Sequence, residues 1–216
     1  MINKLKSLAI IIPAYNEETN IGRVIKSVLP YAFVIVVNDG SFDKTKKIVN
    51  QSSAYRIDHK NNRGYDQSIY AGLKTAKNLG FEFAITFDAD GQHQAKYIRN
   101  IYKELINGSV VVVGSRNKFQ RQAEKFFSSV SNALWKIDDP LSGMKGYNLK
   151  KINKYFYIYR KFNSIGTGIL IKALKDKLFV SQIKITTNER KDKSRFGIGI
   201  LPNLIILFAL VRCLLL

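Results

Sequence analysis

Cysteine is almost missing from this sequence, because its 216 residues include only one, Cys213. A single thiol cannot form an internal disulfide, so a disulfide scaffold is excluded and a reducing compartment is expected. Internal repeats and low-complexity linkers are also missing, and the length suits one well-cored domain. The hydrophobic content of 46% is that of a globular protein and excludes a disordered chain.

Acidic residues are scarce, since 16 Asp and Glu stand against 35 Lys and Arg, which gives a formal net charge of +19. Such a charge attracts polyanions, so nucleic acid, an anionic membrane and phosphorylated substrates are all candidate partners. A compositional bias towards Lys, Asn and Ile would raise the charge in the same way. The charge alone therefore does not choose among these partners.

Several function classes lack their sequence signals here. The N-terminal apolar run, residues 8–12, is short and ends in Pro13 and acidic residues, so we interpret it as a first strand and not as a signal peptide. No GxGxxG motif follows a strand, which argues against a dinucleotide oxidoreductase. The Gly-rich, Arg-containing loop of a sugar-nucleotide pyrophosphorylase is also missing after the first strand. Aromatic residues are not interleaved with basic ones, so we expect no nucleic-acid partner.

What the sequence does contain is an alternation of buried strands and amphipathic helices. Short apolar runs predict strands at 8–12, 33–37, 54–57, 83–87 and 110–113. Apolar residues at helical spacing lie between them, around 21–28, from about 44, and around 69–76 and 98–105. This order predicts an α/β fold with a mostly parallel sheet and helices on both faces.

Polar residues follow three of the predicted strands, and in open α/β sheets the ligand site forms at these strand ends. The segments are Pro13–Glu17, Asn38–Ser41 and Asp88–His93. Asp88 and Asp90 offer hard oxygen ligands for Mg²⁺ or Mn²⁺, which substrate phosphates would complete. The alternative is that each Asp-Gly pair is only a turn. We interpret His93 as a surface residue and Gln92 as the better additional metal ligand.

Six motifs then occur in an order that resembles family 2 glycosyltransferases of the GT-A fold. They are IIPAYNEE, VVNDGSFDKT, NRGYDQSIYAGL, TFDADGQHQ, VVVGSRN and DPLSGMKGYN. Within that family the chain is most similar to polyprenyl-phosphate sugar synthases, such as dolichyl-phosphate mannose synthase. The similarity covers roughly residues 8–147, and a weaker similarity continues to Gly197.

The resemblance implies a role for each matching residue on the donor side. The residues implied to bind the nucleotide-sugar are Pro13, Ala14, Tyr15, Glu17, Asp39, Asp88 and Ala89. Asp88, Asp90 and Gln92 match the metal and diphosphate site, with Mg²⁺ or Mn²⁺ as the cofactor. Asp90 is accordingly a catalytic candidate.

On the acceptor side, Arg116 matches a basic residue that meets the acceptor phosphate in the synthases. Lys125 and Ser129 fall where those enzymes carry Arg and Ser for the same task, and the Lys departs from the pattern because it lacks the two-pronged guanidinium. A hydroxyl acceptor would instead need a carboxylate base, for which Asp139 is the candidate. Departures in the segments SIGTGILIKALKDK and VSQIKITT leave the acceptor side less well defined than the donor side.

The C-terminal residues predict contact with a membrane. We divide the chain into a GT-A domain, 1–197, and an apolar segment, 198–216, which we interpret as a helix lying in the membrane interface. The basic stretch RKDKSRFG at 190–197 would meet anionic headgroups. A buried helix that closes the core or a dimer interface is the alternative, and a homo-oligomer or a membrane partner protein is compatible with either.

Together these features predict an inverting glycosyltransferase, peripheral on the cytoplasmic face of a membrane. It would move a hexose from a UDP- or GDP-linked sugar to a polyprenyl phosphate. Transfer to a hydroxyl of a lipopolysaccharide, capsule or other surface glycan is the alternative reaction. A basic nucleic-acid-binding or non-catalytic protein is the alternative from a different class, and it leaves the strand-end carboxylates unexplained.

Overall fold

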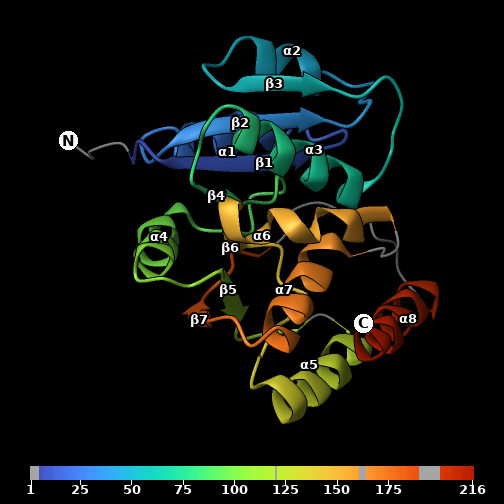
Figure 1. The fold of residues 1–216 in the computed structure, drawn as a ribbon. Helices are drawn as coiled ribbons and strands as arrows, with labels where there is room; N and C mark the ends of the chain where they lie inside the picture. Colours follow the sequence, from blue (N-terminus) through green and yellow to red (C-terminus); the bar gives the residue numbers. More distant parts are fainter. Residues whose placement is uncertain (1–4, 120, 161–163, 190–199) are drawn as a thin grey trace.

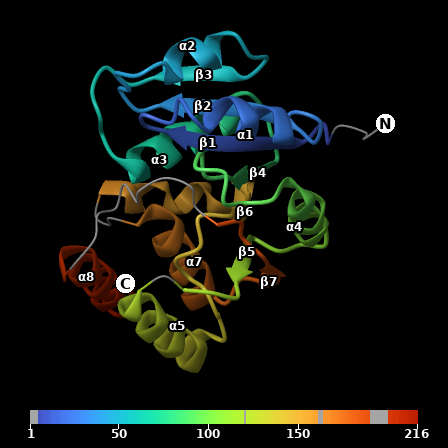
Figure 2. The same cartoon turned by 180° about the vertical axis from the view of Figure 1, so that it is seen from behind.

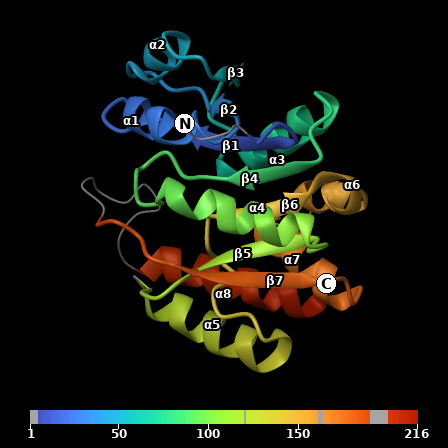
Figure 3. The ribbon, with the colours of Figure 1, turned by 90° about the vertical axis from the view of Figure 1, so that its left-hand side faces the viewer.

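A computed structural model describes residues 5–119, 121–160, 164–189 and 200–216, and its centre is one seven-stranded sheet. The strand order is β3-β2-β1-β4-β6-β5-β7, visible in Figures 1 and 3. The strands are β1 (Leu8–Ala14), β2 (Phe33–Asn38), β3 (Tyr55–Asp58), β4 (Phe83–Thr86), β5 (Val111–Arg116), β6 (Lys145–Asn148) and β7 (Val180–Ile185). All neighbours pair in parallel except β6, which is antiparallel to β4 and β5. The predicted α/β fold with a mostly parallel sheet is therefore confirmed.

Helices cover both faces of this sheet. One face packs on α1 (Ile21–Val28), α2 (Thr45–Asn50) and α4 (Ile98–Ile106), as seen from behind in Figure 2. The other face packs on α3 (Tyr65–Asn78), α5 (Gln122–Trp135), α6 (Leu149–Ile152), α7 (Ile165–Lys175) and α8 (Ile200–Leu215). Two 3₁₀ segments, η1 (Ala95–Tyr97) and η2 (Asn153–Arg160), complete the described elements.

Strand β1 shows why the apolar runs become central strands. All seven of its residues are buried, with Ile10 and Ile12 in one hydrophobic cluster and Ile11 in the cluster on the opposite face. A strand covered by helices on both faces needs apolar side chains in both directions, which produces a continuous apolar run.

Strand β6 was not predicted, because its residues lie inside the motif DPLSGMKGYN and carry no apolar run. Gly146 pairs with Ile85 on one side and with Val112 on the other, so β6 fills the gap between β4 and β5. Because β6 is antiparallel, its first residue lies at the edge where the parallel strands end. The segment 139–145 is thereby brought to the same edge as the strand-end carboxylates.

Helix α8 lies beside α5 (Figure 1). Its inward side chains, Ile206, Leu210 and Cys213, are buried in the core, whereas Phe208 and Val211 are exposed. No helix in the described ranges is long and apolar enough to cross a membrane. The basic stretch 190–197 and the predicted boundary between residues 197 and 198 lie outside the described residues.

Candidate active site

A cavity of about 770 Å³ opens at the carboxyl ends of the parallel strands. Its walls come from the ends of β1, β4 and β5, from the start of β6, and from helices α3, α5, α7 and α8. The sequence-predicted residues that line it are Pro13, Ala14, Tyr15, Glu17, Asp39, Asp88, Ala89, Asp90, Gln92 and Arg116. The structure thus brings every predicted donor-side residue to one cavity.

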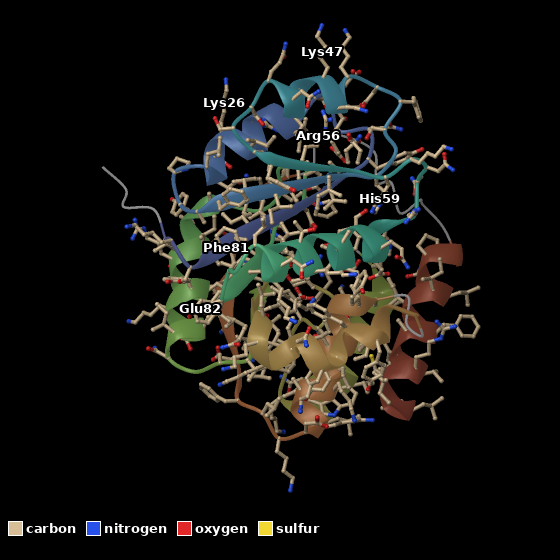
Figure 4. The ribbon with its side chains drawn as sticks, turned by 45° about the horizontal axis from the view of Figure 1, so that its top comes forward. Lys26, Lys47, Arg56, His59, Phe81 and Glu82 are labelled. Atoms are coloured by element: carbon tan, nitrogen blue, oxygen red, sulfur yellow. The ribbon has the colours of Figure 1, made fainter. Side chains whose placement is uncertain are left out.

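Asp39 is held at the end of β2 by three donors. His59, which directly follows β3 (Figure 4), lies with its Nδ1 2.6 Å from Oδ1 of Asp39. The backbone N–H of Arg63 donates to the same oxygen at 3.0 Å, and that of Gly64 donates to Oδ2 at 2.8 Å. These bonds fix the carboxylate in one orientation at the cavity wall, as recognition of a ligand N–H or hydroxyl group requires.

Asp88 is held in the same way on the other side of the cavity. The Tyr65 hydroxyl donates to Oδ1 at 2.9 Å, and Nε2 of His93 lies 2.9 Å from Oδ2. Burial acts to raise the pKa of Asp88, but the charge of His93 and the bonds from His93 and Tyr65 hold it below its usual value. His93 is buried, so its interpretation as a surface residue was wrong.

Gly143 packs directly against the Asp88 carboxylate. A methyl group added at Gly143 would lie only 2.2 Å from Oδ2 of Asp88. Gly143→Ala is therefore expected to displace the carboxylate or the loop that precedes β6, and to lower by about a hundredfold the rate of any reaction that depends on the placement of Asp88. Steady-state kinetics would measure the loss, with Gly22→Ala as the control, because a methyl group there meets only the Ile48 side chain at 3.3 Å. Turnover by Gly143→Ala equal to that of Gly22→Ala would contradict this role for Gly143.

The strand-end residues fit a divalent cation that is shared with a substrate. Asp88, Asp90 and Gln92 line the cavity together, and the backbone N–H of Gln92 donates to Oδ1 of Asp90 at 3.0 Å. Within the described residues, no three His, Cys, Asp or Glu side chains are grouped closely enough to hold a metal alone. Two carboxylates completed by phosphate oxygens are the arrangement that Mg²⁺ commonly uses in nucleotide sites.

Arg116 ends β5 and is fixed by two buried carboxylates. Its Nε and backbone N–H donate to Oδ2 of Asp139 at 2.7 and 3.1 Å, and its Nη2 donates to Oδ1 of Asp139 at 3.0 Å and to Glu124 at 3.3 Å. Burial acts to lower the pKa of Arg116, but the bonds and charges of Asp139 and Glu124 raise it above its usual value. Arg116 therefore remains a cation. Asp139 is fully buried behind Arg116 and does not line the cavity. The structure therefore brings Asp139 against Arg116 and does not bring it to the cavity, where a catalytic base would be needed.

Helix α5 presents a different cation to the cavity from the one predicted. Lys125 and Ser129 are exposed on α5 and do not line the cavity, and the Ser129 hydroxyl donates to the backbone oxygen of Lys125. Arg121 and Glu124 line it instead, and Nη1 of Arg121 donates to Glu124 at 3.2 Å. Glu124 therefore links Arg116 with Arg121. Arg121 directly precedes α5 in an extended conformation, whereas Lys125 and Ser129 lie on the exposed face of the helix, and the motif alone did not reveal this difference.

Two further charged residues on the cavity wall, Asp66 of α3 and Lys145 of β6, were missed by sequence reasoning. The backbone N–H of Ile165 donates to Oδ1 of Asp66 at 2.7 Å, and Nζ of Lys145 donates to the backbone oxygen of Ser142. Burial lowers the pKa of Lys145 to about 8. Each residue stands inside a quoted motif, but nothing in the sequence indicates that α3 and β6 meet.

The pKa of Asp66 makes a prediction about stability. Burial raises it to about 6, although the Ile165 N–H and the charge of Lys145 act in the opposite direction. In the unfolded chain an Asp titrates near about 3.9. Because the folded protein holds this proton more tightly, the contribution of Asp66 to stability is present below about pH 4 and is lost as the pH rises to about 6. The free energy of unfolding, measured with urea from pH 4 to 7, should show this loss in the wild type and not in Asp66→Asn. The same dependence of that free energy on pH in both proteins would contradict the prediction.

Comparison with known proteins places the chain among sugar-transferring enzymes. Residues 9–171 match the sequence profile described as Glycosyl transferase family 2. A UDP-N-acetylglucosamine–dolichyl-phosphate N-acetylglucosaminyltransferase from Methanococcus voltae is 29% identical over 84% of this chain and 86% of its own length. A dolichol-phosphate mannosyltransferase from Pyrococcus furiosus is 30% identical, over 50% of this chain and 33% of that protein.

A solved structure also shares the fold. The crystal structure of glucosyl-3-phosphoglycerate synthase from Mycobacterium tuberculosis, in complex with Mn²⁺, UDP and phosphoglyceric acid, superposes with a TM-score of 0.75. The alignment covers 95% of this chain and 78% of that one. The sequence identity is 18%, so the likeness concerns the fold alone.

Proposed function

Because this chain belongs to glycosyltransferase family 2 and has the family's GT-A-like α/β fold, we propose that it is a metal-dependent, inverting hexosyltransferase acting on a polyprenyl phosphate. The donor would be a UDP- or GDP-linked sugar. The relatives named above act on dolichyl phosphate according to their names, and their similarity supports an acceptor of this kind.

The observation that carries this proposal is the composition of the cavity at the strand ends. Carboxylates line its donor side, the guanidinium groups of Arg116 and Arg121 line another wall, and Ile205, Ile206 and Ala209 of α8 add an apolar wall. The carboxylates suit a metal-bound nucleotide-sugar, the guanidinium groups suit a phosphate, and the apolar wall suits an isoprenoid chain. A polyprenyl phosphate is the acceptor that would contact both the guanidinium groups and the apolar wall.

The residues of the chain would divide the reaction between them. Asp39 would hold the nucleoside, and Asp88 and Asp90, with Gln92, would hold Mg²⁺ or Mn²⁺. The cation would supply charge neutralisation for the leaving nucleoside diphosphate. Arg116, fixed by Asp139 and Glu124, would orient the acceptor phosphate for attack on the anomeric carbon from the face opposite the leaving group.

A hydroxyl acceptor on a surface glycan is supported less well. Such an acceptor needs a carboxylate base within hydrogen-bond reach. Both oxygens of Asp139 are occupied by Arg116, and the residue is fully buried. A phosphate acceptor is already an anion and needs no base, so it agrees better with this arrangement.

Helix α8 lies in the predicted apolar segment 198–216. It would hold the enzyme at an anionic membrane, on the cytoplasmic face. At 16 residues it spans roughly 24 Å, which is shorter than a bilayer core of about 30 Å. Its exposed apolar side chains are Leu204, Ile205, Leu207, Phe208, Val211, Leu214 and Leu215. A helix with one face in the protein core and one exposed apolar face suits the membrane interface.

Phe208→Asp tests this placement. Because Phe208 is 66% exposed, its replacement should leave the fold intact and weaken binding to anionic vesicles by about tenfold. Sedimentation with phosphatidylglycerol-containing vesicles would measure it. Ile106→Asp, on α4 at the opposite face of the sheet, is the matched control. Equal loss of binding in both variants would contradict a specific role for α8.

The proposed reaction is tested with purified protein, undecaprenyl or dolichyl phosphate, and a panel of UDP- and GDP-sugars, with Mn²⁺ or with EDTA. Metal-dependent labelling of the lipid is the expected result, and it identifies the donor as well. Labelling of a glycan hydroxyl without labelling of the lipid would show that the acceptor is the glycan and not the polyprenyl phosphate. Failure to bind any sugar nucleotide would overturn the proposal.

A further inference from the structure

Two oppositely charged side chains lie on the cavity wall between its donor and acceptor sides. Lys145, the first residue of β6, is only 3% exposed, and Asp66, in the first turn of α3, is half-buried. Lys145 interacts electrostatically with Asp88 on the donor side and with Arg116 on the acceptor side, as well as with Asp66. Both residues therefore line the cavity, and Lys145 lies within electrostatic reach of its donor and acceptor sides.

Both side chains keep hydrogen-bonding capacity that the described part of the chain does not use. An ammonium group has three N–H donors, and that of Lys145 has one such partner, the backbone oxygen of Ser142. The carboxylate of Asp66 accepts one N–H, from Ile165, at Oδ1, and its Oδ2 accepts none within those residues. A polar ligand that supplies the missing bonds would stabilise both groups, and most of all the buried ammonium of Lys145.

The surroundings fix Lys145 relative to the strand-end carboxylates. The Thr86 hydroxyl donates to the backbone oxygen of Gly143 at 2.6 Å and accepts the backbone N–H of Lys145 at 3.2 Å. Gly143 in turn packs against the carboxylate of Asp88. A ligand group attached to a phosphate at Asp88 and Asp90 would thus lie next to Lys145.

The charges of the pair indicate which kind of group fits. Burial lowers the pKa of Lys145 to about 8 and raises that of Asp66 to about 6, so at neutral pH both are mainly ionised and their charges cancel. A phosphate would be repelled by Asp66, whereas a neutral ring with hydroxyl groups can both donate to Asp66 and accept from Lys145. Sugar hydroxyls have this dual capacity.

We propose that Asp66 and Lys145 bind the hydroxyl groups of the transferred sugar and select which sugar is accepted. The inference rests on the proposed function and adds the residues that recognise the hydroxyl groups of the sugar. A fixed hydrogen-bond acceptor, Asp66, and a fixed hydrogen-bond donor, Lys145, can distinguish epimeric sugars. Inversion of a single sugar hydroxyl leaves one of these two side chains without its partner.

The test compares the binding of nucleotides with and without a sugar. Isothermal titration in the presence of Mn²⁺ would use UDP, GDP, UDP-glucose, UDP-galactose, UDP-N-acetylglucosamine and GDP-mannose. Asp66→Asn and Lys145→Met should keep the affinity for the bare nucleotide within about twofold. They should weaken the preferred nucleotide-sugar by at least about tenfold and reduce the preference between UDP-glucose and UDP-galactose.

Matched controls are Asp176→Asn and Lys103→Met, which make the same chemical changes outside the cavity. Asp66→Asn is nearly isosteric, so it decides the matter if Lys145→Met does not fold. An unchanged ratio of nucleotide-sugar to nucleotide affinity would overturn the inference, as would a change confined to the KM for polyprenyl phosphate. In either case lipid labelling by the wild type would leave the proposed function standing. A wild type that binds no nucleotide-sugar would overturn both.

Discussion

Asp90→Ala is expected to lower the rate of sugar transfer by at least about a thousandfold and to remove its dependence on Mn²⁺. Asp90 lines the cavity two residues after Asp88, at the end of β4, where a diphosphate would bring its own negative charge. Without the second carboxylate the cation is bound too weakly to offset that charge, and a loss of about 4 kcal/mol of transition-state stabilisation corresponds to this factor.

The measurement is kcat/KM for lipid labelling, with Mn²⁺ and again after removal of metal with EDTA. Wild type treated with EDTA should fall to the level of Asp90→Ala, and the variant itself should show no further loss. Asp176→Asn, at the far end of α7, serves as the control for a removed carboxylate. Metal-dependent transfer that persists in Asp90→Ala would show that the strand-end pair does not hold the cation.

Asp139→Ala is expected to destabilise the fold by about 3 to 5 kcal/mol, because it leaves the guanidinium of Arg116 largely buried beside a single remaining carboxylate, Glu124. Arg116→Met should cost a similar amount, since it leaves Asp139 fully buried without its partner. The double variant Arg116→Met/Asp139→Leu should be more stable than either single variant, because it removes both charges.

Urea unfolding at neutral pH measures these differences. The exposed pair formed by Lys154 and Asp176, with Nζ and Oδ2 3.2 Å apart, provides the comparison, and Lys154→Met should change stability little. Asp139→Ala with the stability of the wild type would mean that Glu124 alone holds Arg116. Arg116→Met and its double variant should both lose transfer to the lipid, because neither has the cation that we propose positions the acceptor phosphate.

The donor side of the site could be predicted because it is local in sequence. Each donor-side segment directly follows a buried parallel strand, and parallel strands end at one edge, so Asp39, Asp88 and Asp90 had to converge. The apolar runs fixed the strands, and the spacing of Ile21, Val24 and Val28 fixed α1. These inferences need only the period of a strand or helix.

The acceptor side depends on contacts that no period reveals. Strand β6 has little apolar pattern, so neither its existence nor its reversed direction was predicted, and with it the position of Lys145 was missed. The burial of His93 and the pairing of Asp139 with Arg116 each join segments through tertiary packing. Lys125 is exposed because the face of α5 that carries Phe127 packs on the core, and Arg121 reaches the cavity from the extended residue that precedes the helix.

The reversed strand β6 also affects how the protein folds. It must insert between β4 and β5, two strands that precede it in the sequence, and its partner Phe83 is separated from Asn148 by more than sixty residues. Pairings between residues so far apart in sequence have a high entropic cost before they gain any stabilising contact, which slows folding. Until β6 inserts, β4 presents an unpaired edge that is prone to intermolecular pairing. The strand that delivers Lys145 to the cavity therefore also covers the edges of β4 and β5 and keeps both from pairing with another chain.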